Sequence, residues 1–268
     1  MPPYSTEGIA KMPFRSTAPL RRSIAVVRLL ALLFTVVYLL PLVLAAGLWI
    51  AGRHPASWRD ADWTSARILP AAAGSPEAAA LILSARTGGL KGAVSEHSWV
   101  VIKERNARRY ERFDKVGWGS PIRRDGYAAD GRWYSNEPRV VAALTGEAAE
   151  VAIPRIRAAI ADYPFAARGG YRIFPGPNSN SFTAHVMRAV PEFGAVLPPA
   201  AVGRDFPVDG RLVHLGRDGF RASFFGYAGV ALGTSAGLEI NILGLVAGID
   251  PFRWTIKIPA LGSFSFAN

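Results

Sequence analysis

The chain has 268 residues, half of them hydrophobic, which is enough to bury the core of one or two domains. It contains no cysteine, so disulfides, thiolate metal sites and a thiol nucleophile are excluded. The net charge is +11, but the basic residues are scattered and form no stripe interleaved with aromatic residues. We therefore expect no nucleic-acid partner, and a basic surface beside a membrane fits anionic headgroups equally well.

The first long apolar segment indicates a membrane anchor. No charged residue occurs from Leu29 to Gly52, and about 20 apolar residues are enough to cross roughly 30 Å of hydrocarbon. Lysine and arginine precede the segment, so the positive-inside rule predicts a cytoplasmic N-terminus and an external main domain. Residues 43–45 resemble a cleavage site, which leaves a cleaved signal peptide as the alternative. The length of the apolar run favours an uncleaved anchor.

Beyond the anchor, residue patterns predict a mixed α+β chain. Residues 53–75 form a lesser helix or a linker. Apolar runs bounded by turn residues predict strands over 79–85, 97–103, 110–118, 132–134 and 171–174. The spacing of apolar residues predicts a helical region over 138–163, which Pro154 divides into two helices.

The part after Pro198-Pro199 is glycine-rich and aromatic, and it is expected to form a small antiparallel sheet. Its predicted strands are 220–227, 238–246 and 254–258. Residues 229–249 are apolar enough to rival the first segment as a membrane span. Glu239 and Asn241 would then lie inside the bilayer at a high cost, so the segment is predicted to be strand.

The stretch from Tyr171 to Arg188 organises the candidate site. A Pro-Gly-Pro turn leads into the polar cluster Asn178-Ser179-Asn180-Ser181, and Phe182 begins an apolar-periodic segment. Asn and Ser at this position most often cap a helix, because their side chains accept bonds from its first N–H groups. The same position also suits a nucleophile, since the helix dipole favours developing negative charge.

Two motifs together resemble a known group of enzymes. His97 begins a predicted strand, and Asn178-Ser179-Asn180-Ser181-Phe182 is similar to the Asn-Cys-Asn-Thr-Phe pattern of PPPDE peptidases. The order, with histidine before the nucleophile, resembles that of the circularly permuted papain-like hydrolases, which include NlpC-type amidases and the lecithin:retinol acyltransferase group. The wider context, HSWVVIK with PGPNSNSFTAHV, also resembles an uncharacterised bacterial family of membrane-anchored envelope proteins.

The resemblance implies roles for five residues. Ser179 stands where the family has its cysteine and would be the nucleophile, and His97 would be its general base. The N–H of Ser179, with Asn178 or Asn180, would form the oxyanion hole. Asp114 is the candidate to orient the imidazole. The polar candidates on the next strand are Arg112 and Asp114, and only the carboxylate of Asp114 can accept a hydrogen bond from an imidazolium. A serine hydroxyl cannot ionise as a thiol does and depends on a well-placed base.

The resulting prediction is an α+β protein with a permuted papain-like helix-plus-antiparallel-sheet domain and a β-rich C-terminal extension. The expected segments are a basic cytoplasmic tail (1–22), a transmembrane anchor (23–52), a linker (53–75), the papain-like domain (76–197) and the β-rich part packing on it (198–268). The expected location is the bacterial inner membrane, with the main domain in the periplasm.

Three functions remain open. The first is an amide or ester hydrolase or acyltransferase acting on a peptidoglycan peptide or a lipid. The second is a non-catalytic binding module that keeps the cleft, and the third is a structural envelope protein that assembles through its tail. No cofactor or metal is expected, because the four histidines are too dispersed to indicate a zinc site.

Overall fold

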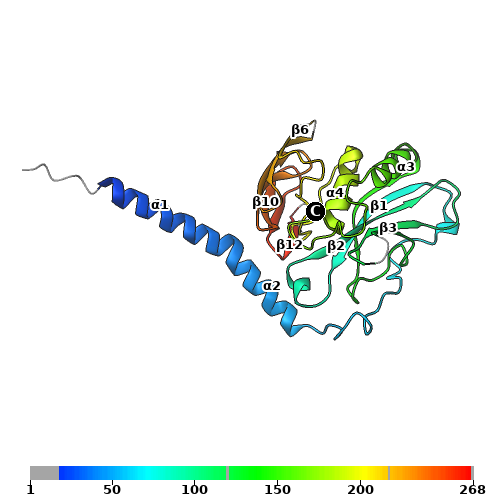
Figure 1. Cartoon of the computed structure of the whole chain (residues 1–268), viewed down its shortest axis with the longest axis horizontal. Coiled ribbons are helices and arrows are strands. Elements are labelled where there is room, and N and C mark those ends of the chain that lie inside the picture. Colours follow the sequence, from blue (N-terminus) through cyan, green and yellow to red (C-terminus); the bar gives the residue numbers. More distant parts are fainter. Residues whose placement is uncertain (1–17, 119–120, 217, 267–268) are drawn as a thin grey trace, which may run out of the picture.

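The computed structural model describes residues 18–118, 121–216 and 218–266. One long helix projects from a body that contains two antiparallel sheets and two further helices (Figure 1). The helical elements are α1 (Ala18–Phe34), the π-helical turn η1 (Thr35–Leu39), α2 (Leu40–Ala51), α3 (Gly146–Ala161) and α4 (Ser179–Ala189), with short 3-10 turns η2 (Ala72–Gly74), η3 (Leu90–Ala93) and η4 (Pro191–Phe193).

The N-terminal helix runs without a break through α1, η1 and α2. Its part from Arg22 to Ala51 is, by length and composition, able to cross a membrane. The π-helical turn ends two residues before Pro41, whose ring would clash with the carbonyl four residues earlier in a regular α-helix. The wider turn lets the helix continue past the proline.

A five-stranded antiparallel sheet forms the centre of the body. Its strands are β1 (Ala79–Arg86), β2 (Glu96–Lys103), β3 (Glu111–Lys115), β4 (Ile122–Arg124) and β5 (Arg139–Thr145), in the order β4-β3-β2-β1-β5. The two central strands β1 and β2 are buried along nearly their whole length. Helices α3 and α4 cover one face, where Ile82 and Val100 pack with Ile156 and Phe182. The linker and residues 127–134 cover the other face.

A second sheet contains seven strands in strict chain order. They are β6 (Val213–Gly216), β7 (Gly219–Phe224), β8 (Ala228–Gly233), β9 (Gly237–Ile242), β10 (Leu245–Asp250), β11 (Thr255–Ile258) and β12 (Gly262–Ser265). Each strand pairs antiparallel with its neighbours, as expected for a chain of hairpins. The predicted β-rich tail is therefore confirmed, and residues 229–249 are strands as predicted.

The region 138–163 differs from its prediction. Residues 139–145 pair with β1 as strand β5, and only residues 146–161 form a helix. Gly146, with φ of +59°, makes the turn between them. Pro154 lies inside α3 without ending it. The proline is exposed, so water can bond the carbonyl that its ring leaves unpaired.

Two shorter predictions were also wrong. Residues 171–174 are a loop rather than a strand, because their backbone groups bond within the same segment: Arg172 N–H donates to the Pro177 carbonyl, and Ile173 O accepts from Asn178 Nδ2. Around 132–134, Trp133 makes only an isolated bridge to Asn136. The linker after the anchor contains no helix beyond the turn η2 within the described residues.

Candidate functional site

The start of α4 is capped by two residues that flank Ser179. The Asn178 side chain accepts from the N–H groups of Asn180 and Ser181, and Ser181 Oγ accepts from Asn178 N–H at 2.7 Å. This reciprocal arrangement is a capping box, which satisfies the free donors of a helix start. The cap therefore accounts for Asn178 and Ser181, and Ser179 takes no part in it.

Asn180 fastens the helix start to the beginning of β2. Its Nδ2 donates to the carbonyls of Glu96 and Val202 at 2.8 and 2.9 Å. As a result Ser179 and His97 line the same small cavity, of about 50 Å³. Its wall is completed by Lys91, Lys115, Trp118, Trp133, Tyr134 and Tyr171, among others.

His97 is held between an aromatic ring and a carboxylate. Its ring stacks on Trp133 with centroids 3.7 Å apart and planes within 6°, and its Nε2 lies 2.8 Å from Asp114 Oδ1. Burial lowers the pKa of His97, and the bond to Asp114, which acts in the opposite direction, does not restore it. The imidazole is therefore neutral at pH 7.

Asp114 is fixed as an anion by Arg112. The guanidinium binds both carboxylate oxygens, with Nε 2.7 Å from Oδ2 and Nη2 2.9 Å from Oδ1. Burial alone would raise the pKa of Asp114, but the charge of Arg112 and the bond from His97 prevail and lower it from 3.8 to about 2. Arg112 is itself fully buried and lies 3.9 Å over the Trp99 ring.

These contacts determine which nitrogen of His97 carries the proton. An ionised carboxylate can only accept, so Nε2 of His97 must be the donor in the bond to Asp114. In the neutral ring Nδ1 is then an unprotonated acceptor. This is the protonation state that a general base requires, and Asp114 bonds the ring nitrogen on the other side of the imidazole from Nδ1.

Of the predicted oxyanion-hole donors, the Ser179 N–H is used neither by the cap nor by a backbone carbonyl, but the Tyr171 hydroxyl accepts a bond from it. The Nδ2 groups of Asn178 and Asn180 are both bonded to backbone carbonyls, and the Asn180 N–H is used in the cap. The Tyr171 hydroxyl contacts Ser179 at the start of α4. Burial raises the pKa of Tyr171, and hydrogen bonds from the side chain and backbone of Ser179 partly offset the rise.

Three residues of the cavity were not singled out from the sequence. Trp133 supplies the stacking surface for His97, and Tyr171 was assigned to a strand. Lys115 is fully buried, its Nζ donates to the Phe165 carbonyl at 2.6 Å, and burial lowers its pKa. Lys115 and Asp114 are neighbours on β3, so their side chains point to opposite faces of the strand. Both side chains are nevertheless buried.

In the described parts of the chain, no three or more histidine or acidic side chains come together in a way that would hold a metal ion.

Comparison with known proteins adds one match. A family model described as a protein of unknown function (DUF3750) matches residues 77–206, just under half of the chain. The matched region includes His97, Asp114 and Ser179 and ends before the seven-stranded sheet begins. No curated protein and no solved structure matches the chain.

Proposed function

We propose that this protein is a membrane-anchored hydrolase or acyltransferase of the bacterial cell envelope, with Ser179, His97 and Asp114 as its catalytic group. The observation that carries the proposal is the bond from His97 to an Asp114 locked as an anion by Arg112. It leaves Nδ1 of His97 unprotonated, and His97 and Ser179 line the same cavity. Such a base compensates for the weak acidity of a serine hydroxyl.

The reaction would proceed in two steps. Ser179 Oγ attacks the acyl carbon of an amide or ester while His97 Nδ1 takes the hydroxyl proton. The amine or alcohol then leaves with that proton, and water releases the acyl group in the second step. The Ser179 N–H at the helix start would stabilise the negative oxygen of each tetrahedral intermediate.

The resemblance to permuted papain-like hydrolases supports this assignment. His97 lies on a strand of an antiparallel sheet, and Ser179 opens a helix that packs on the same sheet. A periplasmic location is part of the proposal, because the basic residues before the apolar helix favour a cytoplasmic N-terminus. The substrate is then a peptidoglycan peptide or a lipid, and the anchor brings a lipid within reach.

Two observations favour a second function, a non-catalytic binding module. The cavity holds only about 50 Å³, and the Tyr171 hydroxyl occupies the donor groups of Ser179. A binding module descended from a cysteine hydrolase, with the thiol replaced and the cavity retained, would have this same geometry. Turnover requires Tyr171 to move away from Ser179, whereas a binding module does not.

A thiol reporter tests the proposal without a known substrate. Because the chain has no cysteine, Ser179→Cys introduces a single thiol whose pKa follows from the pH dependence of iodoacetamide alkylation. We expect a pKa well below the ordinary value of about 8.5. In a second variant that also carries His97→Phe, which keeps the stack on Trp133 but removes the base, the thiol pKa should rise toward that value.

The matched control is Ser263→Cys on the exposed edge strand β12, whose thiol should titrate near 8.5 with or without His97. A Ser179→Cys thiol that titrates like this control would contradict the proposed dyad. So would a low pKa that His97→Phe leaves unchanged, since the helix dipole alone would then account for it.

A further inference from the structure

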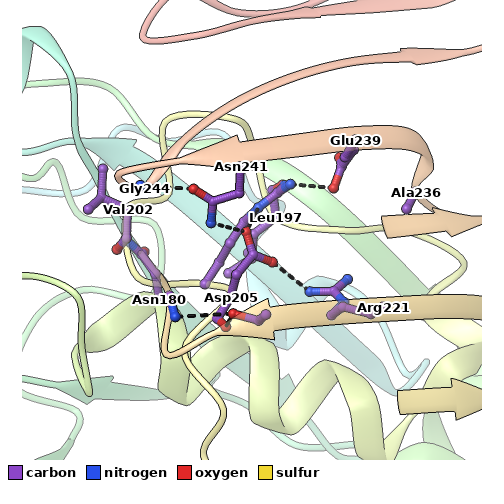
Figure 2. A network of polar contacts seen from close by, with 12 residues as sticks. Asn180, Leu197, Val202, Asp205, Arg221, Ala236, Glu239, Asn241 and Gly244 are labelled. Atoms are coloured by element: carbon purple, nitrogen blue, oxygen red, sulfur yellow. Dashed lines mark hydrogen bonds and ion pairs between the residues drawn. The ribbon is translucent and has the colours of Figure 1, made fainter. Parts of the chain in front are cut away.

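The seven-stranded sheet has its polar side chains inside and its apolar side chains outside. Along β9 the buried residues are Glu239 and Asn241, whereas Leu238 and Ile240 are exposed. In a sheet that covers a soluble core the opposite alternation is expected. The inward charges are also visible in Figure 2, where Glu239, Asn241 and Arg221 point toward the body of the protein.

The inner face is fixed in this orientation by paired charges. Glu239 binds Arg204 and also accepts from Lys257, and Asp205 binds Arg221 at 2.8 Å and accepts from Asn241 at 2.8 Å (Figure 2). Turning the sheet over would break all of these buried pairs, and breaking one such pair costs about 3–5 kcal/mol. The apolar face must therefore remain outward.

The outer face carries a continuous row of large apolar residues. In the strand register each member lies opposite the next across all seven strands, and the exposed fractions range from 38% to 85%. The row, here called the apolar row, consists of Leu215, Phe220, Leu232, Leu238, Ile249, Ile256 and Phe264. At about 4.8 Å between strands it is about 29 Å long. A second, parallel row contains Val213, Val230 and Ile240.

The N-terminal helix lies against this same face. The Tyr38 hydroxyl donates to the Ile240 carbonyl at 2.9 Å. An apolar groove of about 450 Å³ runs between helix and sheet. Its walls are Val36, Val37 and Pro41 on the helix and Leu238, Ile240, Ile249 and Ile256 on the sheet.

The contact lies deep along the helix. Trp49 lies near the end of the apolar run, eleven residues after Tyr38. At about 1.5 Å per residue, the two are about 16 Å apart along the helix axis. That is about half of the roughly 30 Å hydrocarbon thickness. If the helix spans a membrane, the strand that binds Tyr38 lies within the same bilayer rather than above it.

We propose that the outer face of the seven-stranded sheet is embedded in the acyl chains of the bilayer leaflet from which the anchor emerges. The inference rests on the membrane anchor of the proposed function and is independent of any catalysis. Exposed apolar surfaces of this extent mark membrane or protein contacts. Lipid is the occupant because the face continues directly onto a lipid-facing helix.

Spin labels on single cysteines test this directly in the cysteine-free full chain. Leu232→Cys and Ile256→Cys report on the apolar row, Leu33→Cys on the anchor, and Val151→Cys, which is 61% exposed on α3, on the aqueous surface. Each labelled protein is reconstituted into vesicles of phosphatidylethanolamine and phosphatidylglycerol at 3:1. Power saturation then compares collision with oxygen, which is enriched in lipid, and with a water-soluble nickel chelate.

The expected result is an oxygen-to-nickel ratio at positions 232 and 256 that matches position 33 and is several-fold above position 151. Sheet labels that resemble position 151 would place the face in water and overturn the proposal while leaving the anchor intact. Low collision with both reagents, together with dipolar broadening between labels, would show that a second copy covers the face, which also overturns it. A nickel-accessible label at position 33 would remove the anchor on which the inference rests.

Discussion

The buried pair of Asp114 and Arg112 gives the most quantitative prediction. Asp114→Asn keeps the shape of the side chain and removes its charge. The Arg112 guanidinium is then left buried with neutral partners, including the Ala128 carbonyl at 2.8 Å. Removing one member of a buried ion pair costs about 3–5 kcal/mol, because the other charge remains out of water.

The pKa of Asp114 gives a second measure of the same interaction. Its fall from 3.8 to about 2 corresponds to about 2.5 kcal/mol of folding free energy. Since the pKa is depressed in the folded state, this stability is fully present above about pH 4. It is lost as the pH falls from about 4 through about 2. The native chain and the Asp114→Asn variant should therefore differ most at neutral pH.

The assay is urea unfolding of the detergent-solubilised full chain, followed by tryptophan fluorescence at pH 7, 5, 4 and 3. We expect Asp114→Asn to lower the unfolding free energy by about 3–5 kcal/mol at pH 7 and by less at pH 3. The control Asp162→Asn, exposed at the end of α3, should change it by less than about 0.5 kcal/mol. If the loss of unfolding free energy in Asp114→Asn stays constant from pH 7 to pH 3, the assigned role of the Asp114 charge is refuted.

Three further predictions follow from the site and the second sheet. Tyr171→Phe removes the hydroxyl that accepts from Ser179, so labelling of Ser179 by a fluorophosphonate should accelerate about 2- to 10-fold, the equivalent of one hydrogen bond. Slower labelling would show that the Tyr171 hydroxyl assists the reaction of Ser179. Because burial lowers the pKa of His97 below 6.5 and the neutral ring is the base, the midpoint of the rise in labelling rate with pH should lie below pH 6.5. A midpoint above pH 6.5 would contradict this. Glu239→Gln leaves two buried cations without their carboxylate and should destabilise the chain by about 3–5 kcal/mol in urea unfolding, whereas the exposed Glu137→Gln should have little effect.

Local patterns were enough to predict the elements that carry the site. The polar cluster before Phe182 predicted a helix start, and α4 begins at Ser179. The apolar run after His97 predicted β2. The strand β5 was missed because Val140, Val141 and Leu144 also fit a helical spacing, and pairing with β1 decides between the two. Such long-range pairing is not encoded in the local spacing.

The surroundings of the site depend on contacts between distant segments. Asp114 could be nominated because it follows His97 on the neighbouring strand. Nothing in the sequence indicated that Trp133 would stack on the imidazole or that Tyr171 would meet Ser179. The alternation of the second sheet is visible in the sequence of β9, but only the fold shows which of its faces is covered.

The most direct test of the account is covalent labelling of the native serine. The full chain is treated with a fluorophosphonate, which forms an Oγ–phosphorus bond with loss of fluoride, and the modified peptide is identified by mass spectrometry. We expect one adduct on Ser179 that disappears in Ser179→Ala and His97→Phe and persists in Ser263→Ala. An unlabelled native chain, or an adduct on Ser179 that survives His97→Phe, would contradict the proposed catalytic group.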